Sequence, residues 1–230
     1  MARRLAVLLG MTLALPAAGA DLDLLYINRC VGGCQLTPGV DNAIDRKSSV
    51  ISQPSTITAF PHGDAIFNAA VACVRTVLAP YDVTIVTTDP GAVARREVIL
   101  AGNSSNAGLG SGVWGISPWA SGTPLDNVIA FAFAAEIGNS VDNLCWTAAQ
   151  QFGTLYGLDH EYYCPDINSY LSGCGTKSFT NFAASCGEFS ARTCNTNGQP
   201  ATQNSAARMS VVPGKSVVIF RDNFDPGPSP

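Results

Sequence analysis

The residues of this chain that could do metal or acid–base chemistry lie around His160. This imidazole stands between two carboxylic acids, Asp159 and Glu161. Imidazole and carboxylate groups bind transition metals and accept protons, so the triplet could serve a metal site or a general base. The chain has only one other histidine, His62, which rules out a set of three histidine ligands within one chain.

A buried helix is expected to position His160. Its apolar stripe consists of residues three and four positions apart: Leu144, Ala148, Phe152 and Leu155. This spacing predicts a helix over residues 141–156. Gly157 follows the last apolar residues, as is typical of a helix end, where the chain needs a residue that tolerates positive φ. The helix would therefore present His160 just beyond its C-terminus.

Helix, glycine and histidine in this order resemble the long zinc motif of the metzincin metalloproteases, H-E-x-x-H-x-x-G-x-x-H. Gly157 and His160 match the glycine and the last histidine of that motif. Gln150 and Thr154 stand where the first two histidines belong, and Gln151 stands where the glutamate belongs. The chain thus resembles a small, matrixin-like metzincin domain with a degenerate zinc motif.

The resemblance implies a metal position at His160 and no catalytic residue, because Gln151 occupies the place of the general base. Amide and hydroxyl oxygens are poor zinc ligands, and an amide does not accept a proton from water near neutral pH. We therefore expect no cofactor. The family also has a methionine in a turn beneath the zinc; this turn would fall at residues 166–171, with Asn168 in the place of the methionine.

Three hypotheses remain open at this point. The first is a metzincin-like domain that has lost its peptidase activity and binds an extended peptide or protein along the strand at residues 127–134, which the resemblance places at an exposed sheet edge. The second is an active zinc metallopeptidase with a non-standard site around His160, using Asp159, Glu161, Asp166 or His62. The third is an unrelated α/β domain in which the spacing of Gly157 and His160 is coincidental.

The N-terminus and the cysteines indicate an exported protein. Residues 1–20 combine two arginines, an apolar run and small residues at the end, the pattern of a signal peptide. All eight cysteines follow this segment, and an even number in an exported chain predicts disulfide bonds. We expect secretion to the periplasm or the extracellular space, a domain over residues 21–222 and a flexible tail at 223–230.

Charge and hydropathy narrow the range of partners. The formal net charge is −4, and removal of the two arginines of the signal peptide would make it −6. Without a basic stripe, this acidic balance argues against a nucleic-acid partner. The apolar run near the N-terminus is too short to span a membrane, and no later run is longer. We expect a monomer.

The order of the remaining elements predicts an α/β (α+β) fold with a mixed, twisted sheet and two main helices, followed by an irregular, disulfide-stabilised C-terminal part. Residues 31–61 are rich in Gly, Pro, Ser and Asn and predict a long loop, and residues 102–112 predict another. Apolar periodicity predicts helices at 64–78 and 141–156 and a weaker one near 203–211. Strands are expected at 21–28, 81–88, 96–101, 115–118 and 127–134. The metzincin-like architecture implied by the resemblance has this order of elements.

Overall fold

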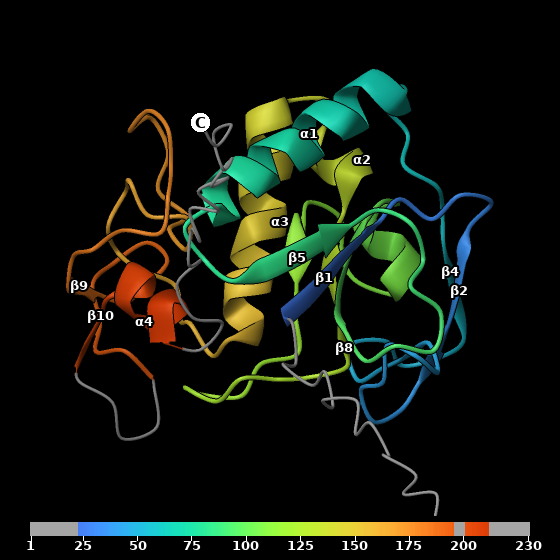
Figure 1. Ribbon diagram of the computed structural model, residues 1–230, viewed down its shortest axis with the longest axis horizontal. Helices are drawn as coiled ribbons and strands as arrows, with labels where there is room; N and C mark the ends of the chain where they lie inside the picture. Colours follow the sequence, from blue (N-terminus) through green and yellow to red (C-terminus); the bar gives the residue numbers. More distant parts are fainter. Residues whose placement is uncertain (1–22, 196–200, 212–230) are drawn as a thin grey trace, which may run out of the picture.

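The computed structural model describes residues 23–195 and 201–211. The predicted signal peptide (1–20) and the predicted tail (223–230) lie outside these residues. Within them, the chain forms one mixed sheet with helices on one face, a small second sheet on the other face, and a loop-rich C-terminal part beside the main layers (Figure 1). The expected α/β class is confirmed.

The main sheet is mixed, as the sequence predicted. Four of its strands run parallel and the fifth runs antiparallel. In spatial order the strands are β5 (Val83–Val86), β1 (Asp23–Asn28), β6 (Arg96–Leu100), β8 (Val128–Ala132) and β7 (Gly115–Ile116). Each was expected within a few residues of its observed bounds. The residues of β6 and β8 are all buried, which explains why β8 and the last three residues of β6 are apolar without alternation, while Arg96 and Glu97 at the start of β6 are buried charged residues.

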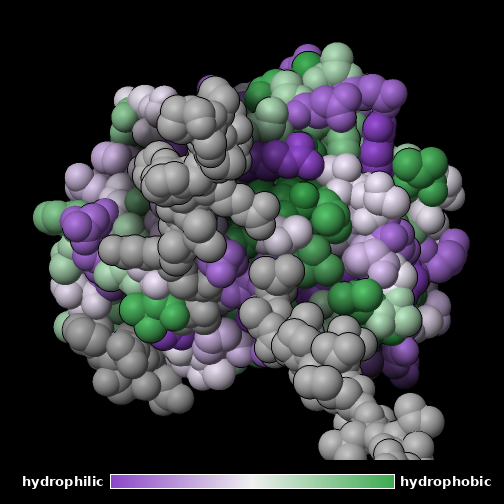
Figure 2. All heavy atoms as spheres, viewed as in Figure 1, coloured by the Kyte–Doolittle hydropathy of each residue, from purple (hydrophilic) through white to green (hydrophobic). Residues whose placement is uncertain are grey.

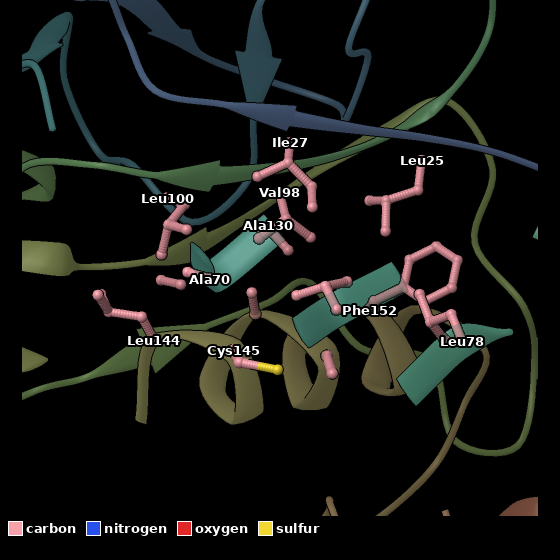
Figure 3. Packing of buried hydrophobic residues seen from close by; sticks show 14 of the residues in the cluster. Leu25, Ile27, Ala70, Leu78, Val98, Leu100, Ala130, Leu144, Cys145 and Phe152 are labelled. Atoms are coloured by element: carbon pink, nitrogen blue, oxygen red, sulfur yellow. The ribbon is translucent and has the colours of Figure 1, made fainter. Parts of the chain in front are cut away.

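Two long helices cover one face of the sheet, where the sequence placed its two main helices. They are α1 (Gly63–Leu78) and α3 (Val141–Leu155). Figure 3 shows Ala70 and Phe152 facing sheet residues such as Ile27 and Val98, all within one buried cluster. A disulfide between Cys73 and Cys145 links the two helices. The main core therefore lies between the sheet and this helix pair.

The other face of the sheet is covered by a segment that the sequence analysis took for a long loop. This expectation for residues 31–61 is wrong in part, because the segment forms a three-stranded sheet of β2 (Cys34–Pro38), β3 (Lys47–Ser48) and β4 (Ser55–Ile57). Leu36 and Ile57 are buried against Ile99 and Phe131 in a second core cluster. β3 and β4 are too short to show alternation, and β2 alternates over only its first four residues. These strands gain stability from burial against the main sheet rather than from local sequence.

The predicted edge strand is also corrected by the structure. Residues 127–134 do contain a strand, β8, but β7 pairs with it and takes the outer position: Gly115 lies opposite Ala132 and Ile116 opposite Phe131. The free edge beside α3 therefore belongs to β7. With only two residues, β7 was too short for its position in the sheet to be deduced from sequence.

The C-terminal part is irregular and cross-linked, as expected. It contains β9 (Ala184–Ser185), β10 (Thr202–Gln203) and α4 (Ser205–Val211), the last within the predicted helical stretch. Disulfides Cys164–Cys174 and Cys186–Cys194 close two of its loops. Two short helices were not expected: α2 (Ala134–Ile137), and the 3₁₀ helix η1 (Ser104–Ala107) in a predicted loop.

The surface is mixed in character. In the view of Figure 2, hydrophilic side chains lie near the outer part of α1, and a hydrophobic area lies near the middle of the face. Among the described residues, no helix combines the length and apolar character required to cross a lipid bilayer.

Candidate functional site

Two adjoining cavities lie between the edge strand β7 and helix α3. The larger has a volume of about 630 Å³ and the smaller about 430 Å³. Both are lined by Gly115 of β7, Gln151 of α3 and Tyr170 of the C-terminal part. We call the two together the edge groove. Four of the five motif residues meet here: Gln150 lines the larger cavity, Gln151 lines both, and Thr154 and His160 line the smaller one. Gly157, the fifth, lines neither cavity.

Gln151, in the place of the general base, is held directly beneath the edge strand. Its side-chain oxygen accepts a hydrogen bond of 2.6 Å from the Ser117 hydroxyl. A Cβ atom on Gly115 would lie only 2.6 Å from the Gln151 amide nitrogen and 2.9 Å from the Phe131 carbonyl oxygen. Only glycine fits at position 115, because strand and helix approach so closely there. The Gln151 amide thus forms part of the groove floor, and only 5% of the residue is exposed.

His160 is oriented by a carboxylate that the sequence analysis did not identify. Its Nδ1 lies 2.8 Å from Glu188 Oε1, and its ring packs against Tyr170 with 4.4 Å between the centroids. In a neutral imidazole, an Nδ1–H donated to Glu188 would leave Nε2 as the atom with a free lone pair. This is the arrangement of a positioned base or a potential metal ligand.

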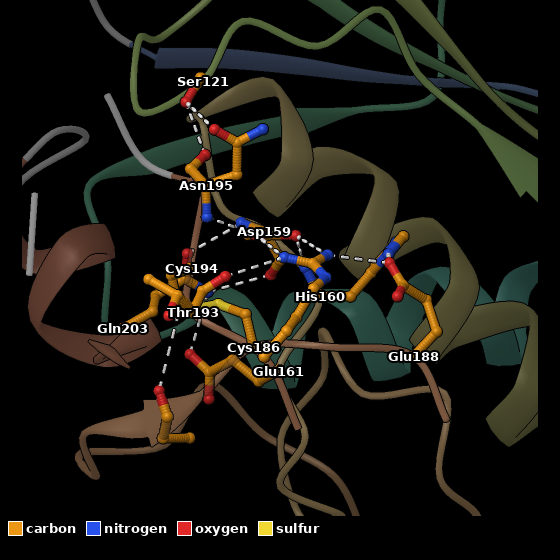
Figure 4. Close-up of a disulfide and its surroundings, with 12 residues drawn as sticks. Ser121, Asp159, His160, Glu161, Cys186, Glu188, Thr193, Cys194, Asn195 and Gln203 are labelled. Atoms are coloured by element: carbon orange, nitrogen blue, oxygen red, sulfur yellow. Dashed lines mark hydrogen bonds and ion pairs between the residues drawn. A yellow bond between two sulfur atoms is a disulfide. The ribbon is translucent and has the colours of Figure 1, made fainter. Parts of the chain in front are cut away.

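Asp159, the other carboxylate at this site, forms a two-pronged ion pair with Arg192. The guanidinium nitrogens of Arg192 lie 2.6 and 2.8 Å from the two carboxylate oxygens of Asp159, and one of them is 3.0 Å from Glu188. Figure 4 shows Asp159, His160 and Glu188 near the Cys186–Cys194 disulfide. Burial raises the pKa of Asp159, but hydrogen bonds from Arg192 and from the backbone N–H groups of Asn195 and His160 outweigh it, so that the pKa is lowered. The hydrogen bond with His160 likewise lowers the pKa of Glu188.

The donor set of this site does not suit zinc. Ligand atoms of Asp159, His160 and Glu188 do lie within 4.8 Å of one another. However, the Arg192 guanidinium contacts both carboxylates and places a permanent positive charge where a cation would need to bind. At the motif positions, the Thr154 hydroxyl donates to the Gln150 carbonyl oxygen at 3.0 Å. Zn²⁺ prefers nitrogen and sulfur ligands, and only His160 supplies one here.

The other candidate ligands from the sequence lie elsewhere. His62 is at the start of α1, with its Nε2 at 2.8 Å from the Ala134 carbonyl oxygen. Glu161 and Asp166 are fully buried on the side of α4 and line neither cavity of the groove. Of the residues proposed to accompany His160, the structure thus brings only Asp159 to it.

Glu161 and Asp166 instead form a buried acid pair beneath the site. Asp166 accepts hydrogen bonds from Thr180, Ser205 and the backbone N–H of Asn168. Glu161 receives one from Gln203, while its Oε2 has no donor among the described residues. Burial, with the nearby charge of Asp166, raises the pKa of Glu161 to about 9, and burial also raises the pKa of Asp166. A proton on Glu161 removes one of the two negative charges from this buried pair.

Asn168, which the resemblance put in the place of the turn methionine, lies buried beneath α3. Its side-chain oxygen is 3.1 Å from the point that a Cβ on Gly153 would occupy. Neither polar atom of its amide has a hydrogen-bond partner within the described part of the chain. A buried amide without partners is costly, so this position is better suited to an apolar side chain.

Several residues of the groove could not be found from the sequence. Glu188 and Arg192 are separated from His160 by 28 and from Asp159 by 33 positions, and their contacts depend on loop geometry. The one local feature that marks Glu188 and Arg192 in the sequence is their position between Cys186 and Cys194, which form a disulfide. The three tryptophans of the chain are a more visible feature of the sequence, and all of them line the groove. Trp114 and Trp146 line the larger cavity, and Trp119 lines the smaller one.

Comparison of the chain with protein-family models, with curated proteins and with solved structures yields no match. The function of the edge groove must therefore be argued from its own residues and geometry.

Replacing Glu161 by glutamine should reduce the dependence of stability on pH. In the folded chain, Glu161 keeps its proton up to about pH 9, whereas the unfolded chain releases it near pH 4.5. The free energy of unfolding therefore falls as pH rises through this window, with a slope of up to about 1.4 kcal/mol per pH unit for one proton. Glu161→Gln has no such proton, so urea unfolding from pH 5 to 8.5 should give a flatter profile.

The matched control for this experiment is Glu136→Gln. Hydrogen bonds from Gly112 and Ser104 lower the pKa of Glu136. Its carboxylate therefore stabilises the fold at neutral pH, and that contribution is lost on acidification. In the Glu136→Gln control, the free energy of unfolding should fall above pH 5 as steeply as in the wild type. An equally steep decline in Glu161→Gln and in the wild type would contradict the assignment of the proton to Glu161.

Replacing Asn168 by leucine should stabilise the protein. Leucine has nearly the same shape as asparagine and removes both buried polar atoms that lack partners, so we expect a gain of about 1–3 kcal/mol in the free energy of unfolding. Asn168→Asp, which keeps the shape but adds a buried charge, should lower it. Urea unfolding at pH 7 measures both. A loss of stability in Asn168→Leu would contradict the prediction that the unpaired amide is costly.

Proposed function

We propose that this chain is an exported, monomeric binding domain of metzincin-like architecture that holds an extended peptide or protein segment in the edge groove without zinc-dependent hydrolysis. The observation that carries the proposal is the position of Gln151. It lies where the resemblance requires a general base, at the floor of the groove, yet its amide cannot accept a proton from water.

The position of Gly157 supports the metzincin-like architecture. The residue directly follows the C-terminal end of α3 with a φ of +82°, and a Cβ there would lie 2.6 Å from backbone atoms of Gly122 and Thr123. Both the backbone conformation and the available space therefore require glycine. The turn at Gly157 brings His160 back to the cavity that Thr154 lines, as expected for the motif's glycine and last histidine.

The charges at His160 support the loss of hydrolysis. Metal-assisted hydrolysis needs several ligands and a base for the attacking water. Here the two carboxylates nearest to His160 are neutralised in part by Arg192. The cluster of Asp159, His160 and Glu188 is the one observation that favours the alternative, an active zinc metallopeptidase with a non-standard site. That alternative would require Arg192 to move away.

The free edge of β7 supports peptide binding. One side of this strand pairs with β8, and the other faces the groove at Gly115 and Ile116. A peptide could extend the sheet there by backbone hydrogen bonds, while the cavities take its side chains. Exposed aromatic residues border the groove: Trp114 is 45% and Phe189 is 82% exposed. Large exposed aromatic groups are typical of binding surfaces.

The cysteine pairing supports export. All eight cysteines pair in four disulfides. Disulfides persist mainly in oxidising compartments, which agrees with the signal-peptide pattern at residues 1–20.

Restoring the three motif positions should create a zinc site. We expect the wild type to carry no stoichiometric zinc, and the triple variant Gln150→His, Gln151→Glu, Thr154→His to bind about one Zn²⁺ per chain, because three histidines would then meet at the groove. Elemental mass spectrometry after dialysis against zinc measures this. Adding His160→Ala to the triple variant should remove the metal.

Two outcomes would contradict this part of the proposal. A triple variant that folds but takes up no zinc would show that the scaffold lacks the metzincin-like geometry. Stoichiometric zinc in the wild type, lost in His160→Ala and accompanied by chelator-sensitive peptide hydrolysis, would instead establish the working metallopeptidase.

Peptide binding should be visible in the intrinsic tryptophan fluorescence, because all three tryptophans line the groove. Titration with pools of unstructured hexapeptides of diverse sequence should change the emission, and the peptides should remain uncleaved by mass spectrometry. Gly115→Val, which puts a side chain against Gln151 and the groove, should weaken binding. Gly110→Val is the control, since a Cβ at Gly110 meets no atom within 4 Å. Fluorescence that is unchanged by every pool would count against the binding role.

A further inference from the structure

The larger cavity of the edge groove has a chemical character of its own. Its walls include aromatic side chains of Trp114, Trp146, Tyr170 and Phe189. Lys177 is the one lining residue with a basic side chain, and no lining residue is an aspartate or a glutamate. The cavity is therefore an aromatic pocket with one cationic group in its wall.

Lys177 is unusual for a lysine because it is nine-tenths buried: only 7% of the residue is exposed. Its ammonium group donates one short hydrogen bond, to the Ser169 carbonyl oxygen. An ammonium group has three N–H donors, and among the described residues no other acceptor and no ion-pair partner is present for Lys177. Two donors are thus left for an acceptor in the cavity.

Asp166 does not fill this role. Its charge acts on Lys177 through space, but its oxygens are engaged by Asn168, Thr180 and Ser205, and it does not line the cavity. Burial lowers the pKa of Lys177, and Asp166 opposes this only in part. An anion next to the ammonium group would offset that cost of burial.

Two glutamine amides add further unused donors. Gln150 is 8% exposed and lines the larger cavity, and neither atom of its side-chain amide has a partner in the described chain. Gln151 uses its side-chain oxygen for Ser117, which leaves its NH₂ group for the groove. The cavity wall therefore presents unused N–H donors of Lys177 and of the two amides, beside the free side-chain oxygen of Gln150.

We propose that the larger cavity is a carboxylate-binding subsite: Lys177 binds a carboxylate of the ligand, the Gln150 and Gln151 amides donate to its oxygens, and an adjacent apolar group packs between the aromatic walls. This inference rests on the proposed function, because it names the chemistry that a bound peptide must carry. The carboxylate is either the free C-terminus of the peptide or an aspartate or glutamate side chain.

Matched acid and amide probes test the subsite on the unmodified protein. We would titrate 3-phenylpropanoate against 3-phenylpropanamide, and acetyl-Ala-Ala-Ala-Phe as the free acid against its C-terminal amide, following tryptophan fluorescence. Each acid should bind roughly tenfold or more tightly than its amide, because a hydrogen-bonded ion pair is lost in the amide. A third pair, acetyl-Ala-Glu-Phe-Ala-amide and its Gln analogue, distinguishes a side-chain carboxylate from a C-terminal one.

Variants assign the effect to Lys177. Lys177→Met keeps the length of the side chain without its charge and should remove the preference for acids, whereas Lys177→Arg should retain it in part. Lys47→Met, at an exposed lysine of β3, should leave both affinities unchanged. Circular dichroism checks that each variant folds. If Lys177→Met does not fold, the comparison of acids with amides on the wild type still tests whether the cavity binds a carboxylate.

The outcomes separate this inference from the proposed function. Equal binding of acids and amides would overturn the carboxylate subsite and leave peptide binding standing. Another outcome is that 3-phenylpropanoate binds, 3-phenylpropanamide does not, and no peptide changes the fluorescence. It would support the subsite and count against the peptide-binding function. An acid preference that persists in a folded Lys177→Met would overturn the role of Lys177.

Discussion

The close packing of α3 between the sheet and the C-terminal part is the constraint on which the rest of the structure depends. Ten of the fifteen residues of this helix are buried, so it is covered on more than the one face that contacts the sheet. A helix in this position cannot shift without opening a core, because protein interiors are packed as densely as organic crystals. Its distance from β7 is therefore fixed, and the width of the groove follows from that distance.

This packing separates the residues that give the groove its shape from those that could act on a ligand. Gly115 of β7 is required by space, because a Cβ atom there would lie 2.9 Å from the Phe131 carbonyl oxygen. The side chains that face the groove, such as Gln151, do not set this spacing. Under the proposed function, such a scaffold would keep a binding groove whether or not its side chains could support hydrolysis.

The sequence predicted those parts of the fold that are long and periodic. Helices α1 and α3 and the strands β1, β6 and β8 appear where apolar spacing placed them. The same reasoning failed for β2, β3 and β4, and it misplaced the sheet edge. Short strands carry too few residues to show a period, and pairing across the sheet decides their position. In the site, the motif residues Gln150, Gln151, Thr154 and His160 all line the groove, although their roles remain predictions. Glu188, Arg192 and Lys177 reach the groove through loops whose course depends on long-range contacts.

The disulfide pattern has a consequence for how the chain reaches this fold. Each cysteine pairs with the next one along the sequence, at separations of 4, 72, 10 and 8 residues. Eight cysteines allow on the order of a hundred pairings, yet this set needs no bridge to span another. Joining the cysteines in their order along the chain would produce the native set directly, without a later exchange of partners. Loop closure costs least entropy when two cysteines are near each other in the sequence, so three of the four disulfides are favoured by proximity alone. The order of the cysteines along the chain thus favours the native pairing, and two of these bridges close loops that supply lining residues to the edge groove.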